Sequence, residues 1–437
     1  MVDQMPEVVS AHPQVVIVGG GFAGLQVAEG LDGAHVRVTI VDQHNFHTFL
    51  PLLYQVATAG LEPADIAYPI RTIFGKSRNV TFRHGRVLVI DWPARQVLLK
   101  DGSHLDFDHL VLATGASAEF FGVKGAREHA LPLYTLADAR HLRNHLLLAL
   151  ERRDAHPVAE RPGVTFVVVG AGPTGVETAG ALIELLEVCV RRDRLQIDLA
   201  ASEVVIVDPV DRVLAPFPRT ASRYAARILT RRGVTLRLGV SVVEVLDDGV
   251  VLSDGSEIEA DGVIWAAGVS GTGTLAESVP GPPTPQRRVP VDADLSVPGL
   301  EGVWAVGDAA AVPTGTRDSD VCPQLAPVAI QSGRHCAAQI LASVEGRPTA
   351  PFRYRDKGIM ATIGRRAAVA ALPRGPVLRG TLGWLSWLGL HLAYLIGFRN
   401  RLRVLLNWTW RYFDWPSGPR LIVADAETAD EPHSTGQ

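Results

Sequence analysis

Residues 15–24 read VVIVGGGFAG, an apolar run that leads directly into three glycines spaced as G-x-G-x-x-G. The run predicts a buried strand over residues 15–18, followed by a tight turn and a helix. In such a turn Gly19 allows the sharp bend, Gly21 lets a pyrophosphate approach the backbone, and Gly24 lets helix and strand pack closely. The pattern predicts a dinucleotide-binding turn, although a purely structural turn could contain the same residues.

The next apolar run, residues 38–41, ends in Asp42, which follows Gly24 by 18 residues. A carboxylate at this spacing stands at the end of the second strand, where it can accept a hydrogen bond from a ribose hydroxyl. Asp42 therefore strengthens the interpretation of the glycines as a nucleotide site.

The same plan then occurs a second time. Residues 165–169 are apolar and lead into Gly170, Gly172 and Gly175, a second G-x-G-x-x-G, and a later apolar run ends in Asp208. A carboxylate at that strand end accepts from a free 2′-hydroxyl and repels a 2′-phosphate, which favours NADH over NADPH. The alternative is that Asp208 only begins the following turn.

Three landmarks repeat at nearly one offset. Gly170 follows Gly19 by 151 residues, and the Asp-Gly pair at 254–255 follows the pair at 101–102 by 153. Gly268, which ends a third apolar strand, follows Gly115 by 153. Each Asp-Gly pair predicts a hairpin. The repeat predicts an α/β fold with two Rossmann-like dinucleotide-binding domains.

A further strand, within residues 303–311 (VWAVGDAAA), is expected to end at Gly307-Asp308, to be followed by a helix, and to return to the first sheet. The second domain would then be inserted in the first. Asp308 could hydrogen-bond the ribityl chain of a flavin, or it could serve as a helix N-cap. Two nucleotide sites predict an electron relay from a soluble nicotinamide to a tightly bound flavin.

Composition limits the other possibilities. The chain has 437 residues and a net charge of −4, which gives no general attraction to nucleic acid. Its three cysteines, Cys189, Cys322 and Cys336, form no C-x-x-C pair, so we expect neither a disulfide framework nor a metal site. His44 and His47 have no carboxylate at a matching spacing and are expected to pack or to face the flavin.

The chain resembles the type II NADH:quinone oxidoreductases, single-subunit flavoproteins with a glutathione-reductase-like fold, over about residues 15–421. The glycine motifs alone would fit many flavoprotein reductases. The segments PLLYQVAT, TGVE and ATIGR are much more specific to this family. The tail is most similar to actinobacterial members. The matching stretches are VVIVGGGFAGL, HNFHTFLPLLYQVAT, VVVGAGPTGVETAG, VWAVGDAAAV, LAPVAIQSG, KGIMATIGR and LHLAYLIGFRNRL.

The resemblance implies FAD in the first copy and NADH in the second. It also implies that Glu177 lies near the flavin and the nicotinamide, although an acid early in a helix could simply complement the helix dipole. Lys357 matches a lysine linked to the quinone region, or it could form a surface ion pair. No transmembrane proton path is visible, so we expect no proton pumping.

One departure concerns the quinone region. Where the family often has A-Q-x-A-x-Q, this chain keeps the final glutamine, Gln331, but has Pro327 in place of the first. Proline supplies neither a side-chain amide nor a backbone N–H. Gln324, three residues earlier, could substitute.

The carboxy-terminal region is basic and apolar. Residues 357–420 contain ten basic residues and one acid, Asp414, a local charge of +9 that leaves −13 on the rest. Residues 380–398 contain no formal charge, and five of the eight tryptophans lie at 384, 387, 408, 410 and 415. This composition predicts a helix or helix pair in the membrane interface. A dimer interface or a core helix would read similarly.

These expectations combine into one organisation. Residues 13–155 and 291–346 form the FAD-binding domain, residues 156–290 the inserted NADH-binding domain, and residues 347–424 a quinone and membrane-interface region. The leading hypothesis is a peripheral NADH dehydrogenase on the cytoplasmic face of the membrane that reduces menaquinone or ubiquinone, possible as a homodimer. The alternatives are a soluble NAD(P)H reductase of ferredoxin or a soluble quinone, and a redox-sensing flavoprotein.

Overall fold

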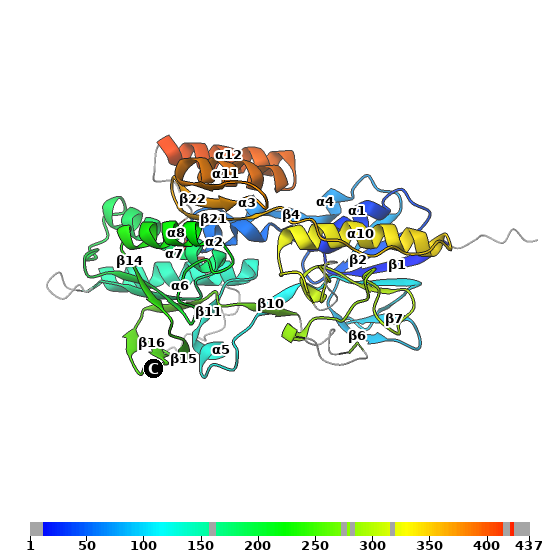
Figure 1. The fold of residues 1–437 in the computed structure, drawn as a ribbon, viewed down its shortest axis with the longest axis horizontal. Helices are drawn as coiled ribbons and strands as arrows, with labels where there is room; N and C mark the ends of the chain where they lie inside the picture. Colours follow the sequence, from blue (N-terminus) through cyan, green and yellow to red (C-terminus); the bar gives the residue numbers. More distant parts are fainter. Residues whose placement is uncertain are drawn as a thin grey trace, which may run out of the picture. The chain divides into compact units, whose positions relative to one another are not determined.

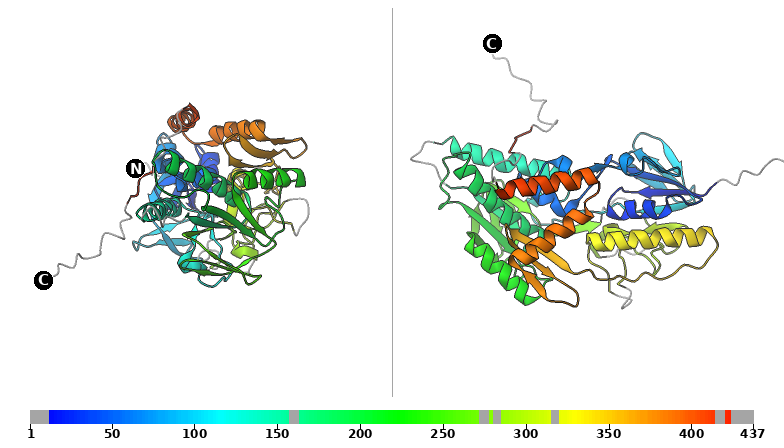
Figure 2. Two further views of the ribbon diagram at one scale, coloured as in Figure 1. Left: turned by 90° about the vertical axis from the view of Figure 1, so that its left-hand side faces the viewer. Right: turned by 90° about the horizontal axis from the view of Figure 1, so that it is seen from above.

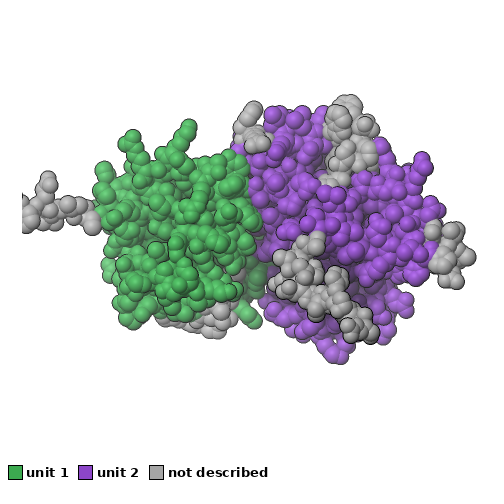
Figure 3. All heavy atoms as spheres, turned by 180° about the vertical axis from the view of Figure 1, so that it is seen from behind, with its two compact units in different colours: residues 1–47, 68–117, 269–356 green, residues 48–67, 118–268, 357–437 purple. Residues whose placement is uncertain are grey.

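The chain divides into two compact units, which are coloured separately in Figure 3. Unit 1 consists of Met1–His47, Tyr68–Ser117 and Val269–Asp356, and unit 2 of Thr48–Ala67, Ala118–Gly268 and Lys357–Gln437. The computed structural model describes residues 12–156, 163–271, 278–279, 285–314, 320–413 and 420–423. Residues 48–67 therefore group with the second glycine motif, although they follow the first in sequence.

Unit 1 is built on a five-stranded parallel sheet in the order β20-β9-β1-β2-β5. The apolar run before the first glycines forms β1, and helix α1 follows the glycine turn as predicted. The strand expected to return to the first sheet is β20, which pairs with β9. The elements are β1 (Gln14–Val18), α1 (Phe22–Leu31), β2 (Arg37–Asp42), β5 (Val80–His84), β9 (His109–Leu112), β20 (Val303–Ala305) and α10 (Ala326–Val344).

Unit 2 repeats this sheet in the order β11-β18-β12-β13-β14, again with parallel pairs. Strands β12 and β18 are almost entirely buried because protein covers both faces of the sheet. The elements are β11 (Leu131–Pro132), β12 (Thr165–Val169), α7 (Pro173–Arg191), β13 (Glu203–Asp208), α8 (Arg219–Arg231), β14 (Val234–Leu238) and β18 (Gly262–Trp265).

Each unit carries a three-stranded antiparallel meander, and both predicted hairpins are confirmed. The repeat extends to single side chains, because Arg83 pairs with Asp101 at 2.6 Å and Arg237 pairs with Asp254 at 3.0 Å. The strands are β6 (Val87–Asp91), β7 (Gln96–Leu99) and β8 (His104–Asp106) in one unit, and β15 (Val242–Leu246), β16 (Gly249–Leu252) and β17 (Glu257–Glu259) in the other.

The carboxy-terminal region of unit 2 contains an antiparallel sheet and the helix pair that its composition predicted. Helix α11 packs on β22 and β23, and α12 contacts α11 (Figure 1; Figure 2, right). The elements are β21 (Ile359–Gly364), β22 (Ala367–Ala371), β23 (Val377–Arg379), α11 (Gly380–Tyr394) and α12 (Phe398–Phe413). Among the described residues, no helix combines the length and apolarity that crossing a membrane requires.

Shorter elements complete the chain. They are β3 (Phe46–Thr48), η1 (Leu50–Leu52), α2 (Leu53–Ala57), α3 (Pro63–Ile66), β4 (Ala67–Pro69), α4 (Ile70–Ile73), β10 (Ala116–Ala118), α5 (Ala126–His129), α6 (Leu136–Asp154), β19 (Val269–Gly271), η3 (Pro285–Arg287) and η4 (Gly307–Ala309). One expectation is wrong: only the three-residue 3-10 turn η4 follows β20, and the next long helix, α10, begins at Ala326.

Candidate active site

The structure explains differently why each of the three positions in the first turn is a glycine. Gly19 has φ +111°, and a Cβ there would lie 2.2 Å from the carbonyl oxygen of Ala113. A Cβ on Gly24 would lie 1.9 Å from the carbonyl oxygen of Gly19, so the helix and the strand touch at this point. A Cβ on Gly21 would meet nothing within 4 Å. The middle glycine therefore faces open space, which the approach of a pyrophosphate to this backbone would require.

The second turn repeats this geometry. Gly170 has φ +110°, and a Cβ there would lie 2.5 Å from the carbonyl oxygen of Ala266. A Cβ on Gly175 would lie 1.9 Å from the carbonyl oxygen of Gly170. Gly172 again faces open space. It is also the N-cap of α7 and offers no side-chain cap to the first N–H groups of the helix. Those N–H groups and the helix dipole favour an anion.

The two strand-end acids also match. The Asp42 carboxylate accepts a hydrogen bond from the backbone N–H of Gly20 at 2.6 Å, and Asp208 accepts from Ala171 at 2.6 Å. Each acid also accepts from the amide two residues further on, at 2.7 Å and 2.8 Å. A carboxylate has about four acceptor positions, so both acids retain capacity for a ribose hydroxyl. The acids thus fix the glycine turns.

Gly115 and Asp308 stand at neighbouring strand ends of the first sheet. Gly115 follows β9 with φ +72°, a left-handed conformation that suits glycine. Asp308 lies in η4, directly after Gly307, where a Cβ would come 2.9 Å from the side chain of Ala23 in α1. Asp308 is therefore close to the start of the helix that follows the first glycine turn.

His47, expected either to pack or to face the flavin, is packed inside unit 1. Its ring is buried against Phe22, with centroids 4.8 Å apart, and its Nδ1 lies 3.2 Å from the carbonyl oxygen of Gly20. Burial lowers the pKa of His47 to about 4. Hydrogen bonding to Asp42 raises the pKa of His44. Among the described residues, no group of three or more His, Cys, Asp or Glu is placed to hold a metal ion.

Unit 2 contains a pocket that opens to the surface. Its walls combine aromatic and aliphatic side chains with a few polar groups, an arrangement typical of small-molecule sites. Helices α2, α7, α11 and α12 and strand β21 all contribute. The lining residues that matter here are Tyr54, Gln55, Thr58, Glu177, Glu184, Leu185, Thr362, Arg365, Trp384, Trp387, Leu388, Trp408 and Arg420.

Glu177 is the ionisable group of the pocket with a strongly shifted pKa. Burial raises the pKa of its carboxyl to about 8, against the hydrogen bond from the backbone N–H of Thr362 at 3.1 Å and the nearby Trp387 side chain, which lower it. The carboxyl is therefore mostly protonated at neutral pH. Glu177 is the fifth residue of α7, one turn inside, so the interpretation as a complement to the helix dipole is wrong.

A second acid of the pocket, Glu184, is held differently. Its Oε1 accepts from Arg232 at 2.8 Å and from the backbone N–H of Arg365 at 2.6 Å. Arg232 in turn donates to the carbonyl oxygen of Arg365. This network ties α7 and the end of α8 to the turn after β21, and it fixes part of the pocket wall.

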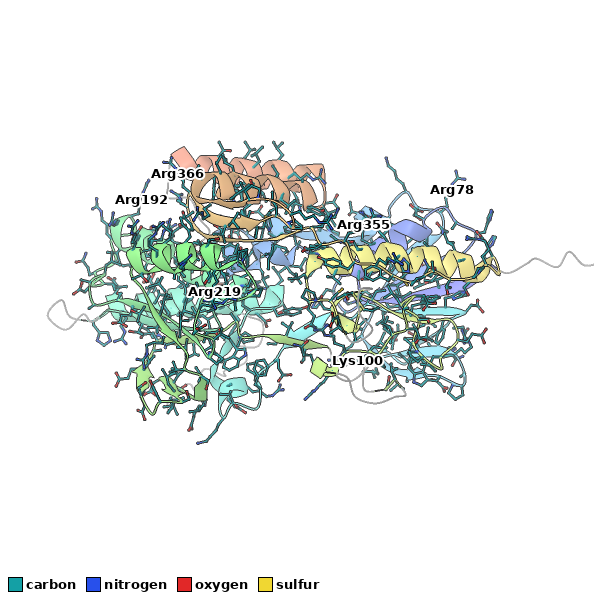
Figure 4. All side chains as sticks on the ribbon, in the orientation of Figure 1. Arg78, Lys100, Arg192, Arg219, Arg355 and Arg366 are labelled. Carbon is teal, nitrogen blue, oxygen red and sulfur yellow. The ribbon has the colours of Figure 1, made fainter. Side chains whose placement is uncertain are left out.

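The glutamines of the predicted quinone motif make backbone contacts. Gln331 donates to the carbonyl oxygen of Arg355 and accepts from its N–H, both at 3.0 Å; Arg355 lies beside α10 in Figure 4. Gln324 donates to the carbonyl oxygen of Asp308 at 3.0 Å. Pro327 lies in the first turn of α10, where a missing N–H costs nothing. Lys357 is exposed at the start of the last segment of unit 2.

The tryptophans differ in position. Trp387 and Trp408 are both buried, and their ring centroids lie 5.8 Å apart. The indole N–H of Trp408 donates to the side-chain oxygen of Gln55 at 3.1 Å. They hold α11 and α12 on the unit and line the pocket, so they are packing residues. Trp384 lines the pocket. Trp415 lies outside the described residues, as does the side chain of Trp410.

Thr362 and Glu184 line the pocket and were not singled out from the sequence. Thr362 lies in ATIGR, and Tyr54, Gln55 and Thr58 lie in PLLYQVAT. Both stretches match the family specifically, but the sequence gives their residues no role, because nothing in their spacing shows that they meet at Glu177.

Comparison with known proteins gives the same picture. The family model described as pyridine nucleotide-disulphide oxidoreductase matches residues 13–333. The chain is 38% identical to the type II NADH:quinone oxidoreductase Ndh of Mycobacterium tuberculosis, over 95% of this chain and 91% of that protein. It is 30% identical to the mitochondrial internal alternative NAD(P)H-ubiquinone oxidoreductase A1 of Arabidopsis thaliana, over 91% and 83% of the two chains.

Solved structures share the fold. NDH2 from Plasmodium falciparum in complex with NADH superposes with a TM-score of 0.85 at 17% identity, covering 94% of this chain and 99% of that one. The fold class predicted from the repeated glycine motifs is thereby confirmed. On its identity to the mycobacterial enzyme and its match to the family model, the chain belongs to the type II NADH:quinone oxidoreductases.

Proposed function

We propose that the first glycine turn holds FAD and the second holds NADH in this NADH:quinone oxidoreductase. FAD, when bound, accepts a hydride from NADH and passes two electrons on to a quinone. The open space before Gly21 and Gly172 supports both assignments, because a pyrophosphate needs that approach. The residues assigned to FAD are Gly19, Gly21, Gly24, Asp42, Gly115 and Asp308, and those assigned to NADH are Gly170, Gly172, Gly175 and Asp208.

The sequence assigned residues 13–155 and 291–346 to FAD, residues 156–290 to NADH, and residues 347–424 to the quinone and the membrane. The compact units differ from these bounds, because residues 48–67 and 118–155 group with the second glycine turn and residues 269–290 with the first. We therefore assign FAD to the sheet of unit 1 and NADH to that of unit 2. Asp208 would select NADH, since its ionised carboxylate accepts from a 2′-hydroxyl and repels a 2′-phosphate.

The observation that carries the quinone assignment is a neutral carboxyl in an aromatic-lined pocket. Reducing a quinone to a quinol adds two electrons and two protons, and Glu177, with a pKa of about 8, can donate one proton at neutral pH. Trp384 and Leu388 of α11 supply apolar surface for the ring and the start of the tail. We assign the quinone headgroup to the space next to Glu177.

Gln331 and Lys357 have supporting parts in this proposal. Gln331 fixes the backbone of Arg355, two residues before Lys357, through paired hydrogen bonds. An exposed lysine on a segment held in this way can balance negative charge that develops during quinone reduction. We expect menaquinone or ubiquinone to be the acceptor.

We propose that the outer faces of α11 and α12 bind the membrane, and that this is its cytoplasmic face. On α12, Asn400, Val404 and Trp408 are buried at four-residue spacing, while Leu402, Leu405 and Leu406 are exposed. On α11, Leu382 is 67% exposed. Arg401 and Arg403 stand among these leucines and would meet anionic headgroups. An apolar and basic face of this kind suits an interfacial helix pair, and pairing with a second copy is the other outcome to test.

Anaerobic stopped-flow spectroscopy tests the function. NADH should bleach the flavin absorbance of the purified enzyme, and added menaquinone or ubiquinone should restore it. If a water-soluble dye restores the absorbance but neither lipophilic quinone does, the quinone assignment is wrong. If NADH produces no bleaching, the assignment of NADH to the second turn is wrong.

A further inference from the structure

Phe121 is an exposed aromatic residue in a strained backbone conformation. Its side chain is 62% exposed, and its φ of +53° lies in the left-handed region that residues with a Cβ rarely adopt. Such outliers persist where the surrounding structure holds them, and they gather at functional sites. Neither the glycine turns nor the pocket at Glu177 accounts for this residue.

The segment that carries Phe121 is fixed by Glu119. The N–H of Phe121 donates to the Glu119 carboxylate at 2.9 Å, and the N–H of Glu119 donates to the carbonyl oxygen of Gly268 at 3.1 Å. The indole of Trp265 donates to the carbonyl oxygen of Glu119 at 2.7 Å. The neighbouring Phe120 ring packs against Trp265, with centroids 5.5 Å apart. Phe120 therefore serves the core, whereas Phe121 is held with its ring outside.

The ring of Phe121 lies at the dinucleotide edge of the second sheet. A Cβ on Gly268 would come 3.0 Å from its Cζ. Two residues before Gly268, the carbonyl oxygen of Ala266 lies 2.5 Å from the position of a Cβ on Gly170. A continuous line of close contacts thus joins the second glycine turn to Phe121 through residues 266–268.

The strand order decides which half of a dinucleotide reaches this place. Asp208 ends β13 on one side of β12, and residues 266–268 follow β18 on the other side. A dinucleotide whose adenosine ribose meets Asp208 and whose pyrophosphate meets Gly172 continues across the sheet edge toward Gly268. Adjacent strands are about 4.8 Å apart, so its second base comes to the glycine over which the Phe121 ring lies.

We propose that Phe121 binds the nicotinamide half of NADH by ring contact above Gly268. The left-handed backbone and the Glu119 hydrogen bond present the ring before the nucleotide arrives, and the missing side chain at Gly268 lets the ring lie close against the backbone after β18, with its other face open to the base. This proposal rests on the assignment of NADH to the second glycine turn.

Two ligands that differ only in the nicotinamide test the proposal. NAD⁺ contains it, ADP-ribose lacks it, and neither reduces the flavin, so both can be titrated calorimetrically into the FAD-loaded enzyme. Phe121→Gly removes the ring and suits a positive φ, so the fold should keep its melting temperature or gain slightly. We expect it to weaken NAD⁺ binding roughly 5- to 150-fold, because stacking of a base on an aromatic ring is worth about 1–3 kcal/mol, with unchanged ADP-ribose binding.

Phe121→Tyr keeps a ring and should bind NAD⁺ as the wild type does. Val243→Ala shortens another exposed apolar side chain of unit 2, on β15, and should leave the affinities for NAD⁺ and ADP-ribose unchanged. The proposal is overturned if Phe121→Gly leaves the affinity for NAD⁺ unchanged, or if it lowers the affinities for NAD⁺ and ADP-ribose equally. Asp208→Ala tests the assignment of NADH to the second turn separately from the role of Phe121. It should weaken the binding of both NAD⁺ and ADP-ribose. If it changes the affinity for neither, the NADH assignment of the second turn is wrong.

Discussion

The carboxyl of Glu177 accepts a hydrogen bond from the backbone N–H of Thr362 at 3.1 Å, which joins the start of α7 to β21 inside unit 2. One hydrogen bond does not offset the loss of water around this side chain, and burial raises its pKa to about 8. An acid of this kind at the end of an aromatic-lined pocket can supply a proton at physiological pH.

Glu177 should therefore set the pH dependence of quinone reduction. The protonated form is the donor, so the rate of flavin reoxidation should fall as the pH rises through about 8. Glu177→Gln cannot donate a proton, and we expect a loss of roughly 10²-fold or more in this step and a flat profile. Flavin reduction by NADH, followed in the same stopped-flow experiment, is the control. A wild-type profile that is flat between pH 6 and 9.5 would contradict the assigned role.

The same group should affect stability. The folded-state pKa of about 8 exceeds the ordinary value of 4.5, so the native state binds this proton more tightly than the unfolded chain does. The contribution of the protonated Glu177 to the free energy of unfolding is complete below pH 4.5 and is lost as the pH rises through about 8. Glu177→Gln should reduce the fall in melting temperature between pH 5 and 9. Equal falls in the wild type and the variant would show that the carboxyl is not desolvated.

Gly172 and Gly175 should separate binding from folding. A Cβ on Gly175 would meet the carbonyl oxygen of Gly170 at 1.9 Å, so Gly175→Ala should destabilise the fold by roughly 1–3 kcal/mol. A Cβ on Gly172 meets nothing within 4 Å, so Gly172→Ala should keep the melting temperature and lose affinity for NADH. Thermal unfolding and NAD⁺ titration measure the two effects, and unchanged NAD⁺ affinity in Gly172→Ala would argue against a pyrophosphate at this turn.

Asp208 should determine the choice of nicotinamide. A hydrogen bond to a charged group contributes roughly 1.5–3 kcal/mol, so Asp208→Ala should raise the KM for NADH about tenfold or more and reduce the discrimination against NADPH. Asp211→Asn removes a nearby exposed charge and serves as the control. The ratio of kcat/KM for NADH and NADPH is the measurement, and a ratio equal to that of the wild type would exclude the assignment.

The exposed leucines of the helix pair should control membrane binding. Leu382 and Leu406 are 67% and 57% exposed, and burying a leucine side chain is worth roughly 1.5–3 kcal/mol. The double variant Leu382→Gln, Leu406→Gln should lose at least about tenfold in affinity for anionic vesicles in a flotation assay. Leu88→Gln with Val89→Gln, on exposed β6 of unit 1, is the matched control. A dimer that dissociates in the first variant, with vesicle binding unchanged, would assign the face to self-association.

A charge control addresses the basic part of the same face. Arg401 and Arg403 are exposed, and Arg78 and Lys100, labelled in Figure 4, carry the same charge in unit 1. If anionic lipid is the partner, neutralising the first pair should weaken vesicle binding more than neutralising the second, and salt should remove the difference.

The sequence by itself determined the doubled fold. Gly19 and Gly170, the strand-end acids Asp42 and Asp208, and the Asp-Gly hairpins are local signals, because each reflects a backbone conformation or a strand end set by a few adjacent residues. They were enough to identify two equivalent sheets and the resemblance to a family of flavoprotein oxidoreductases. Local signals do not extend to the helix after β20, because a 3-10 turn and a helix start share the same few residues.

Only the tertiary structure decided which side chains meet. The pocket joins Tyr54, Glu177, Thr362 and Trp387 from four separate stretches, and the raised pKa of Glu177 exists only because those stretches exclude water. Likewise, Phe121 is an unremarkable residue in the sequence and becomes a candidate ligand contact only through Gly268, which is 147 positions away. Desolvation and contact between distant segments depend on how the chain packs, which no short pattern of residues encodes.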